Sequence, residues 1–218
     1  MSGGGRTGPD HRPVGAAGAT AAVLFIALFR LRSLGPLDFW AWLVLNTMIL
    51  VALSFVFDSG YGQRLKEDLR SALLRKVSIG IASAAVLYGV FALGRIAALH
   101  IFPFAESGIG NVYALKAGVP ALRIMVLIVV IIGPGEELFW RGFFQERAGA
   151  TTSRAFGLAL TGLLYTAVHL ASGNLMLVLA AAVCGAFWGW IYLRFRSPVL
   201  NIVSHTVWDL AVLVIFPF

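Results

Sequence analysis

Two adjacent carboxylates, Glu136 and Glu137, lie in an otherwise apolar stretch of the chain. One acidic residue at the centre of a membrane-spanning helix costs about 2.5 to 3.5 kcal/mol on insertion scales. Ionisable side chains that a sequence keeps at this cost usually face the interior of a helical bundle and mark a site of function. The pair therefore indicates a working site inside a membrane protein.

The spacing of the neighbouring residues predicts different roles for the two carboxylates. Glu137 and Arg141 are four residues apart, so on a helix they share a face and can form an ion pair. Glu136 points about 100° away from Glu137 and is left to face another element. We therefore predict one braced carboxylate, Glu137, and one available carboxylate, Glu136. The structural alternative for Arg141 is a cytoplasmic charge whose side chain reaches the membrane surface.

Three further ionisable residues lie in the later apolar segments: His169, His205 and Asp209. His205 and Asp209 are four residues apart, so one helix face presents an imidazole with an acid within reach. A carboxylate and an imidazole can hold and activate a water molecule for attack. Each residue also has a structural interpretation. His169 fits a core histidine bonded to a carbonyl, and His205 with Asp209 fits a hydrogen-bonded pair that joins two helices.

The run Gly133-Pro134-Gly135 directly precedes the glutamates. Proline removes a backbone donor and clashes with the preceding turn, and the flanking glycines loosen a helix further. We therefore expect a helix break here, with Glu136 in the first turn of a half-helix. The dipole of such a half-helix favours an ionised carboxylate, whereas desolvation opposes it.

Composition identifies the kind of protein. The chain of 218 residues is 59% hydrophobic and 12% charged, with a mean hydropathy of +0.87, which is typical of a membrane protein. Apolar runs of about 20 residues, the length that crosses a bilayer, recur along it. The sequence predicts an all-α fold, a polytopic transmembrane helical bundle of about seven spans, at residues 14–30, 37–57, 77–99, 120–148, 153–171, 174–193 and 197–217.

The same pattern predicts the organisation of the chain. Residues 1–13 are rich in glycine and polar, and we expect a disordered tail. Residues 14–119 hold accessory spans, and residues 120–217 hold the ionisable core. The first span is followed by arginines instead of a small-residue cleavage site, which favours a retained anchor over a signal peptide. The single cysteine, Cys184, excludes an intrachain disulfide.

The net charge of +7 follows from topology. Cytoplasmic segments hold most of the basic residues if the N-terminus is cytoplasmic and the C-terminus lies outside, as the positive-inside rule requires. We expect the cluster at 64–76 to rest on anionic lipid headgroups. Nucleic-acid binding is disfavoured, since the sequence has no recognisable module for it. The Gly-, Ala- and Arg-rich composition favours a bacterial inner membrane. The basic residues assigned to the cytoplasmic side are Arg6, Arg12, Arg64, Lys66, Arg70, Arg75, Lys76, Arg141, Arg147, Arg154, Arg194 and Arg196, and those assigned outside are Arg30, Arg32, Lys116 and Arg123.

Three motifs in order carry a family resemblance over roughly residues 120–210. Glu136-Glu137-Leu-Phe-Trp-Arg141 has the form EExxxR, Tyr165-Thr-Ala-Val-His169 follows FxxxH with tyrosine first, and His205-Thr-Val-Trp-Asp209 follows HxxxN with aspartate last. This set resembles the CAAX-protease and bacteriocin-processing (CPBP, or Abi) family of intramembrane proteases.

The resemblance implies hydrolysis of a peptide bond in a protein or peptide substrate, such as the terminal tail or leader of a membrane-associated or exported protein. It implies that Glu136 and His169 activate water, and that His205 and Asp209 stabilise the oxyanion. Glu137 and Arg141 would support the site structurally.

The aspartate at the end of the third motif departs from the family pattern, because an ionised Asp209 cannot donate to an oxyanion. It is either protonated, an acid that orients His205, or a metal ligand. In the last case Glu136, His169, His205 and Asp209 would bind zinc. We favour the orienting role, in which no cofactor takes part. Zinc is the one cofactor that the metal-ligand alternative would add.

Two other functions remain as alternatives. A non-enzymatic immunity or scaffold protein would keep the motifs for packing. A proton-coupled carrier would use the ionisable set as a relay, but no inverted repeat is evident. The protease reading also faces a conflict of depth. From the predicted span ends, Glu136 lies about 18 Å deep, His169 about 25 Å and His205 about 10 to 12 Å, at 1.5 Å per residue.

Overall fold

The computed structural model describes residues 12–218, and this part of the chain is almost entirely helical. It contains no strands beyond one isolated bridge between Leu34 and Leu37. The predicted disordered tail lies largely outside the described residues. Its last two positions are an exception, because helix α1 begins at Arg12 and includes Pro13. The first span therefore begins two residues earlier than predicted.

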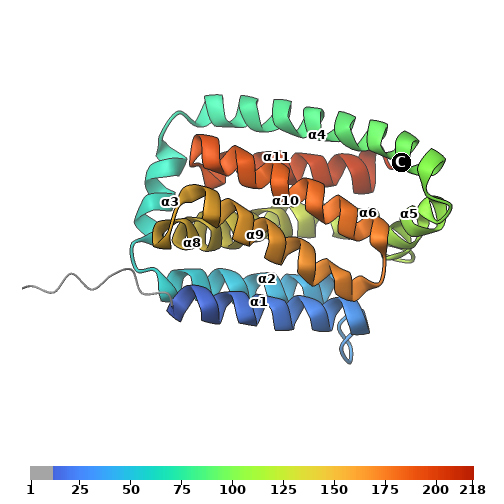
Figure 1. The fold of residues 1–218 in the computed structure, drawn as a ribbon, viewed down its shortest axis with the longest axis horizontal. Helices are drawn as coiled ribbons and strands as arrows, with labels where there is room; N and C mark the ends of the chain where they lie inside the picture. Colours follow the sequence, from blue (N-terminus) through green and yellow to red (C-terminus); the bar gives the residue numbers. More distant parts are fainter. Residues whose placement is uncertain (1–11) are drawn as a thin grey trace, which may run out of the picture.

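Six helices are long and apolar enough to cross a membrane in the described part. They run roughly antiparallel to one another, side by side, as Figure 1 shows. Their order and length confirm the all-α, polytopic helical bundle. The six are α1 (Arg12–Leu31), α2 (Phe39–Phe57), α4 (Leu73–Ile101), α9 (Arg154–His169) continued by η3 to Ser172, α10 (Leu175–Phe195), and α11 (Pro198–Leu210) continued by η4 to Ile215.

The remaining predicted span, 120–148, is a composite helix that carries the glutamates. Its pieces follow one another without an interruption: α6 (Ala121–Leu127), η1 (Ile128–Ile132), α7 (Gly133–Glu137), η2 (Leu138–Gln145) and α8 (Glu146–Thr151). The two η segments are π-helical, a form that is frequent at functional sites. The composite helix occupies the seventh predicted span, but it is not among the six helices apolar enough to cross a membrane in the described part.

The predicted break at Pro134 is wrong. The chain stays helical through it, and the N–H of Gly133 bonds the carbonyl of Ile128, five residues back. This wider π turn lies just before the proline, where a regular turn would clash with the ring. Glu136 therefore lies inside a continuous helix instead of in the first turn of a half-helix.

The two glycines beside Pro134 serve close packing. A Cβ on Gly133 would lie 2.4 Å from Thr206 Oγ1 of α11, and a Cβ on Gly135 would lie 2.2 Å from Thr47 Cγ2 of α2. Real Cβ atoms do not approach other atoms this closely. The glycines therefore allow α7 to contact α11 on one side and α2 on the other.

Short helices close the two ends of the bundle. Helix α3 (Tyr61–Arg70) lies at the end where α1 begins, whereas α5 (Ala105–Ala114), η3 (Leu170–Ser172) and η4 (Ala211–Ile215) lie at the other end (Figure 1). Tyr61 of α3 donates to the carbonyl of Leu138 in η2 over 2.7 Å. Burial raises the pKa of Tyr61 well above its usual value, so the hydroxyl stays a donor.

Helix α3 also holds the start of α11. The Asp68 carboxylate accepts hydrogen bonds from Ser197 Oγ at 2.9 Å and from the Val199 N–H at 3.0 Å. Lys76, at the start of α4, pairs with the same aspartate. The start of α11 is consequently buried, with Ser197, Val199 and Leu200 all below the surface.

Candidate active site

Glu137 is the centre of a buried polar network. Its Oε1 accepts from Arg141 Nη1 at 2.8 Å and from His205 Nδ1 at 2.7 Å, while its Oε2 accepts from Asn201 Nδ2 at 3.1 Å. Both Glu137 and Arg141 are 0% exposed. The predicted ion pair between them is present, and two further donors satisfy the carboxylate.

Arg141 is held by rings as well as by Glu137. Its guanidinium lies 5.0 Å from the centre of the Tyr165 ring and 5.6 Å from that of Trp188. A desolvated cation over an aromatic face gains about 2 kcal/mol. These contacts partly offset the burial of two guanidinium nitrogens, Nε and Nη2, which have no hydrogen-bond partner among the described residues. Arg141 is therefore an internal residue of the bundle, not a charge at the membrane surface.

Asn201 is a residue of this network that sequence analysis missed. Its Nδ2 donates both to Glu137 and to the carbonyl of Trp188, at 2.8 Å. The Trp188 ring in turn stacks on the His205 ring, with centroids 3.8 Å apart. A signal for Asn201 existed in the sequence, because it lies four residues before His205 and so shares its helix face.

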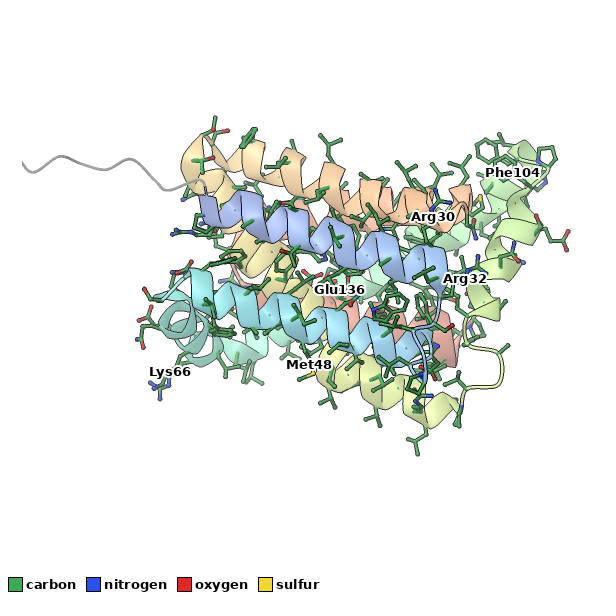
Figure 2. All side chains as sticks on the ribbon, turned by 90° about the horizontal axis from the view of Figure 1, so that it is seen from below. Arg30, Arg32, Met48, Lys66, Phe104 and Glu136 are labelled. Atoms are coloured by element: carbon green, nitrogen blue, oxygen red, sulfur yellow. The ribbon has the colours of Figure 1, made fainter. Side chains whose placement is uncertain are left out.

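Glu136 has a different environment on the other side of α7. One hydrogen bond reaches it, from the Tyr165 hydroxyl to Oε2 at 3.2 Å, and it forms no ion pair within residues 12–218. The hydroxyl that distinguishes Tyr165 from the family's phenylalanine thus meets Glu136. Figure 2 labels Glu136 where α1 and α2 run next to each other. Apolar side chains from these helices line the narrow gap beside it, including Phe25 and Leu50.

His169 lies one turn beyond Tyr165 on α9. Its Nδ1 is 2.7 Å from the Tyr165 carbonyl, and a carbonyl only accepts, so Nδ1 carries the hydrogen. The other ring nitrogen, Nε2, then has a free lone pair when the imidazole is neutral. Nε2 has no hydrogen-bond partner in the described part of the chain. Rings of Phe29 and Tyr165 lie beside the imidazole, at centroid distances of 4.8 and 5.0 Å.

The conflict of depth disappears in the structure. The composite helix continues to Thr151, so Glu136 lies about 22 Å from that end, and His169 lies about 22 Å from the start of α9 at Arg154. His205 lies at the level of Glu137, because its Nδ1 is 2.7 Å from Glu137 Oε1. The estimate from sequence failed because it placed the ends of all spans on one plane.

Asp209 is not the closest partner of His205. Its Oδ2 is 3.4 Å from His205 Nε2, whereas Glu137 Oε1 is 2.7 Å from Nδ1. The structure thus groups the predicted residues into two sets. Glu137, Arg141, His205 and Asp209 form one network, and Glu136 meets His169 through Tyr165, which contacts both.

The four residues predicted as possible zinc ligands are not arranged as a metal site in this structure. Among residues 12–218, no group of three or more His, Cys, Asp and Glu side chains is arranged to hold a metal ion. Glu136, His169, His205 and Asp209 would have to rearrange to bind one.

Comparison with known proteins gives one match. Residues 118–211 match the family model described as type II CAAX prenyl endopeptidase Rce1-like. No curated protein and no solved structure matched the chain. The matched segment contains all three motifs, and it supports a peptidase embedded in the membrane. The match agrees with the family resemblance predicted from the motifs, and it covers residues 118–211, less than half of the chain.

Proposed function

We propose that the protein is an intramembrane endopeptidase that cuts a peptide bond near a terminus of a membrane-associated or exported protein. One observation carries the proposal. Within the segment that matches an endopeptidase family, Glu136 is a buried carboxylate with a single hydrogen bond from residues 12–218, and Tyr165 contacts both it and His169. A base that is buried but not neutralised by an ion pair remains available for proton transfer.

In the proposed reaction, a water molecule is held between Glu136 and His169 Nε2. Glu136 takes a proton from this water while the water oxygen forms a bond to the carbonyl carbon of the substrate. The carbonyl oxygen becomes an oxyanion. When the intermediate collapses, the carbon–nitrogen bond breaks and the proton passes from Glu136 to the leaving amine. His169 keeps its orientation because Nδ1 is tied to the Tyr165 carbonyl.

We assign stabilisation of the oxyanion to His205. Glu137 fixes the ring through Nδ1, and stacking on Trp188 fixes its plane, so Nε2 is the nitrogen that can serve a substrate. Because Nδ1 already donates to Glu137, Nε2 donates to the oxyanion when the imidazole is protonated. A fixed donor to an oxyanion is commonly worth about 3 to 4 kcal/mol in the transition state. Asp209 would orient the Nε2 side of the ring, and zinc binding by Glu136, His169, His205 and Asp209 is the alternative.

Access to Glu136 requires helix movement. The gap beside it is closed by side chains of α1 and α2, so a peptide reaches the carboxylate when one of these helices moves. One polar contact ties the two helices together, from Asn46 Nδ2 to the Leu24 carbonyl at 3.0 Å. We propose that substrate enters between α1 and α2.

The predicted topology completes the proposal. An N-terminus in the cytoplasm places exposed basic side chains of α3 and the start of α4 at cytoplasmic headgroups of a bacterial inner membrane, among them Lys66, Arg70 and Arg75. The opposite end of the bundle, with Arg32, would then face outward.

The test compares peptide termini in membrane and exported fractions of cells that express the native protein or Glu136→Gln. Glu106→Gln is the matched control, because Glu106 is an exposed glutamate on α5. We expect at least one terminus that requires the native protein or the control and is missing with Glu136→Gln. Equal expression with every terminus unchanged would contradict the protease and favour a scaffold or immunity protein.

A second arm uses the purified protein and defined peptides. Peptides ending in cysteine and three further residues, with and without a farnesyl group, show whether a prenyl chain is recognised. Cleavage is measured with and without a zinc chelator. We expect cleavage to survive chelation, whereas loss that added zinc restores would support the metal alternative.

A further inference from the structure

Ser204 lies directly before His205 on α11, and its side chain is 0% exposed. Its Oγ accepts hydrogen bonds from Trp188 Nε1 of α10 at 3.1 Å and from Ser83 Oγ of α4 at 2.9 Å. A hydroxyl oxygen has two lone pairs, so these two bonds use its full capacity as an acceptor. Neither serine belongs to the motifs, and neither does Trp188. Three helices therefore meet at one buried hydroxyl.

The Trp188 ring connects this hydroxyl to His205. Its face stacks on the imidazole, with centroids 3.8 Å apart and planes 22° apart, while its N–H edge bonds Ser204. Neighbouring residues of a helix point about 100° apart, so Ser204 and His205 reach the same indole from different directions. The hydrogen bond at Nε1 limits how far the indole can turn. The stacked indole in turn limits how far the imidazole can tilt.

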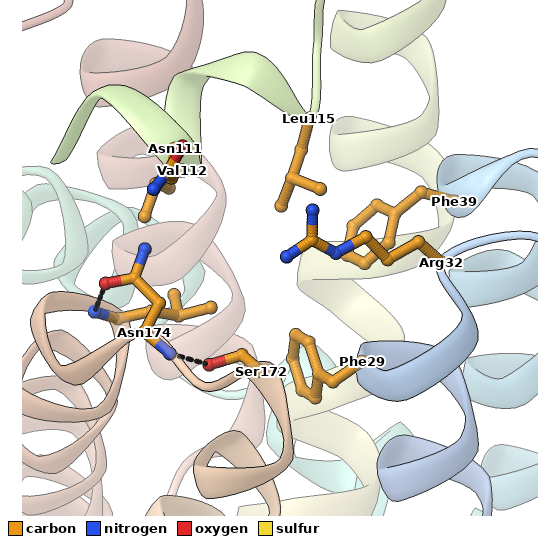
Figure 3. Close-up of a pocket in the computed structure, with 9 residues that line it drawn as sticks. Phe29, Arg32, Phe39, Asn111, Val112, Leu115, Ser172 and Asn174 are labelled. Carbon is orange, nitrogen blue, oxygen red and sulfur yellow. Dashed lines mark hydrogen bonds between the residues drawn. The ribbon is translucent and has the colours of Figure 1, made fainter. Parts of the chain in front are cut away.

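The hydrogen bonds of Ser204 differ from those of other serines in the described residues. Ser54 Oγ donates to the Leu50 carbonyl of its own helix at 2.9 Å, which is a common partner of a helical serine. Ser172, at the edge of the small pocket in Figure 3, accepts from the Asn174 N–H within the turn between α9 and α10. Both serve the backbone near them. Ser204 instead joins side chains of two other helices.

Helix α4 supplies its contact from outside the matched segment. It precedes residues 118–211 and runs along α11, as Figure 1 shows. The two helices approach closely at Gly80, where an added Cβ would lie 2.8 Å from Val203 Cβ. Ser83 follows Gly80 by three residues, so it lies on the same face of α4. One of the accessory spans therefore reaches the network around His205.

We propose that Ser204 is a positioning residue, which holds the Trp188 ring and through it the His205 ring. Ser83 supports it from α4. The inference rests on the proposed function, in which His205 Nε2 stabilises the oxyanion. Glu137 holds the opposite nitrogen, Nδ1, at 2.7 Å, and a single hydrogen bond allows the ring to tilt about that nitrogen. The indole plane removes this freedom, so Nε2 keeps one direction toward the substrate.

A purely structural role for the two serines predicts different results. Polar side chains between membrane helices can simply join the helices, and their loss then lowers stability without moving His205. A positioning role moves the His205 ring and lowers kcat. It leaves KM nearly unchanged, because the oxyanion forms only during the reaction and not in the bound substrate.

The first measurement follows the His205 ring without any substrate. Protein labelled with ¹³C-histidine is studied by NMR in detergent micelles, and the His205 signal is the one missing from His205→Gln. A ring proton above an indole face resonates upfield. Ser204→Ala should move this signal downfield, toward its position in Trp188→Leu. Ser54→Ala is the matched control, because Ser54 is also 0% exposed, and it should leave the signal in place.

The second measurement is the cleavage of a farnesylated peptide that ends in cysteine and three further residues. Ser204→Ala should lower kcat about three- to tenfold, as the loss of one hydrogen bond gives, and change KM less than about twofold. Trp188→Phe removes the N–H and should also lower kcat. The double variant should be no slower than the slower single variant, because both changes break the same bond. Ser54→Ala should cleave at the native rate.

An unchanged His205 signal in Ser204→Ala would overturn the positioning role, even in a less stable variant. Losses of kcat that multiply in the double variant would overturn it too. If Ser204→Ala does not fold, Ser83→Ala decides, because it keeps the acceptor for Trp188. We expect a smaller downfield movement of the His205 signal in Ser83→Ala, and no movement would overturn the proposal.

The two proposals fail separately. A protein whose His205 signal moves as expected but which cuts no peptide would keep the positioning network and remove the protease. Cleavage by Ser204→Ala with the native kcat would leave the protease standing and remove the positioning role.

Discussion

The two faces of α7 hold the same side chain in two different environments. Glu137 faces α11 and receives hydrogen bonds from Arg141, Asn201 and His205. Glu136 faces α1, α2 and α9, and among residues 12–218 only the Tyr165 hydroxyl donates a hydrogen bond to its side chain. Both carboxylates are buried, yet only one has lost its capacity to serve a reaction.

This difference shows how a buried charge is matched to a role. The cost of burying a carboxylate is offset when opposite charge and hydrogen bonds surround it, as around Glu137. Around Glu136 few groups offset the cost of burying the carboxylate. A carboxylate that is buried without such groups indicates a functional role. The residue that the fold stabilises best is thus the poorer candidate for catalysis.

The largest effects should come from exchanging each glutamate for glutamine. Glu136→Gln removes the proposed base, and we expect cleavage to fall about 10² to 10⁴-fold, with little change in thermal stability. Glu137→Gln leaves Arg141 buried beside a neutral partner, and we expect a loss of about 3 to 5 kcal/mol in the free energy of unfolding. Cleavage rates and denaturant unfolding in detergent check the pair.

The comparison breaks if the two variants behave alike. A strong loss of stability in Glu136→Gln would show that Glu136 is a structural residue. A stable Glu137→Gln would show that the rings around Arg141 can hold it without a counter-charge. Glu106→Gln on the surface of α5 reports the background of both measurements.

Much of this fold could be predicted from the sequence, for a simple physical reason. Each span must be long and apolar to cross a bilayer, so six of the seven predicted spans recur as long apolar helices in residues 12–218. The Glu137–Arg141 pair was equally predictable, since both residues lie on one helix and their spacing fixes their distance.

The sequence predictions that were wrong concern features that depend on contacts between helices. The helix through Pro134 continues because the π turn before it makes room, and the glycines beside it are set by Thr47 and Thr206 on other helices. The depth of His205 depends on Asp68, which holds the start of α11 inside the bundle. No local pattern in the sequence encodes these contacts.

The two glycines of α7 allow the packing of its two faces to be compared, since Gly133 contacts α11 and Gly135 contacts α2. Gly135→Ala and Gly133→Ala should each lower the free energy of unfolding by about 1 to 3 kcal/mol, because each added methyl overlaps a threonine. Thr47→Ser removes the atom that Gly135→Ala would meet and keeps the hydroxyl bonded to the Leu43 carbonyl. The double variant should therefore recover most of the loss.

The opposite face should not be rescued in the same way. A Cβ on Gly133 also lies 3.1 Å from the Ile128 carbonyl and 3.3 Å from Thr206 Cα, which are backbone atoms. Thr206→Ala should recover only part of the loss, as measured by the same unfolding experiment. Full recovery would mean that the backbone of α7 and α11 can shift to accommodate the added methyl group more easily than α7 and α2 can.

A smaller effect is expected from Tyr165→Phe. The change removes the one hydrogen bond to Glu136 and restores the residue that is usual in the family motif. Loss of a single hydrogen bond costs about 0.5 to 1.5 kcal/mol, so the cleavage rate should change less than about tenfold. A rate as low as that of Glu136→Gln would show that the hydroxyl itself takes part in the reaction, and stability measured in parallel separates a folding defect.

The smallest effect should follow from Asp209→Asn. The Asp209 oxygen lies 3.4 Å from His205 Nε2, which is long for a hydrogen bond, and Glu137 already fixes the ring from the other side. The free energy of unfolding should therefore change by less than about 0.5 kcal/mol, as at sites without a specific strong contact. Cleavage should be kept or increased, because an amide can donate to an oxyanion and a carboxylate cannot. A large loss of cleavage in a stable variant would show that the negative charge is needed. Repeating the assay with added zinc then separates the remaining roles, since a weakened metal site recovers at high zinc, whereas a misoriented His205 does not.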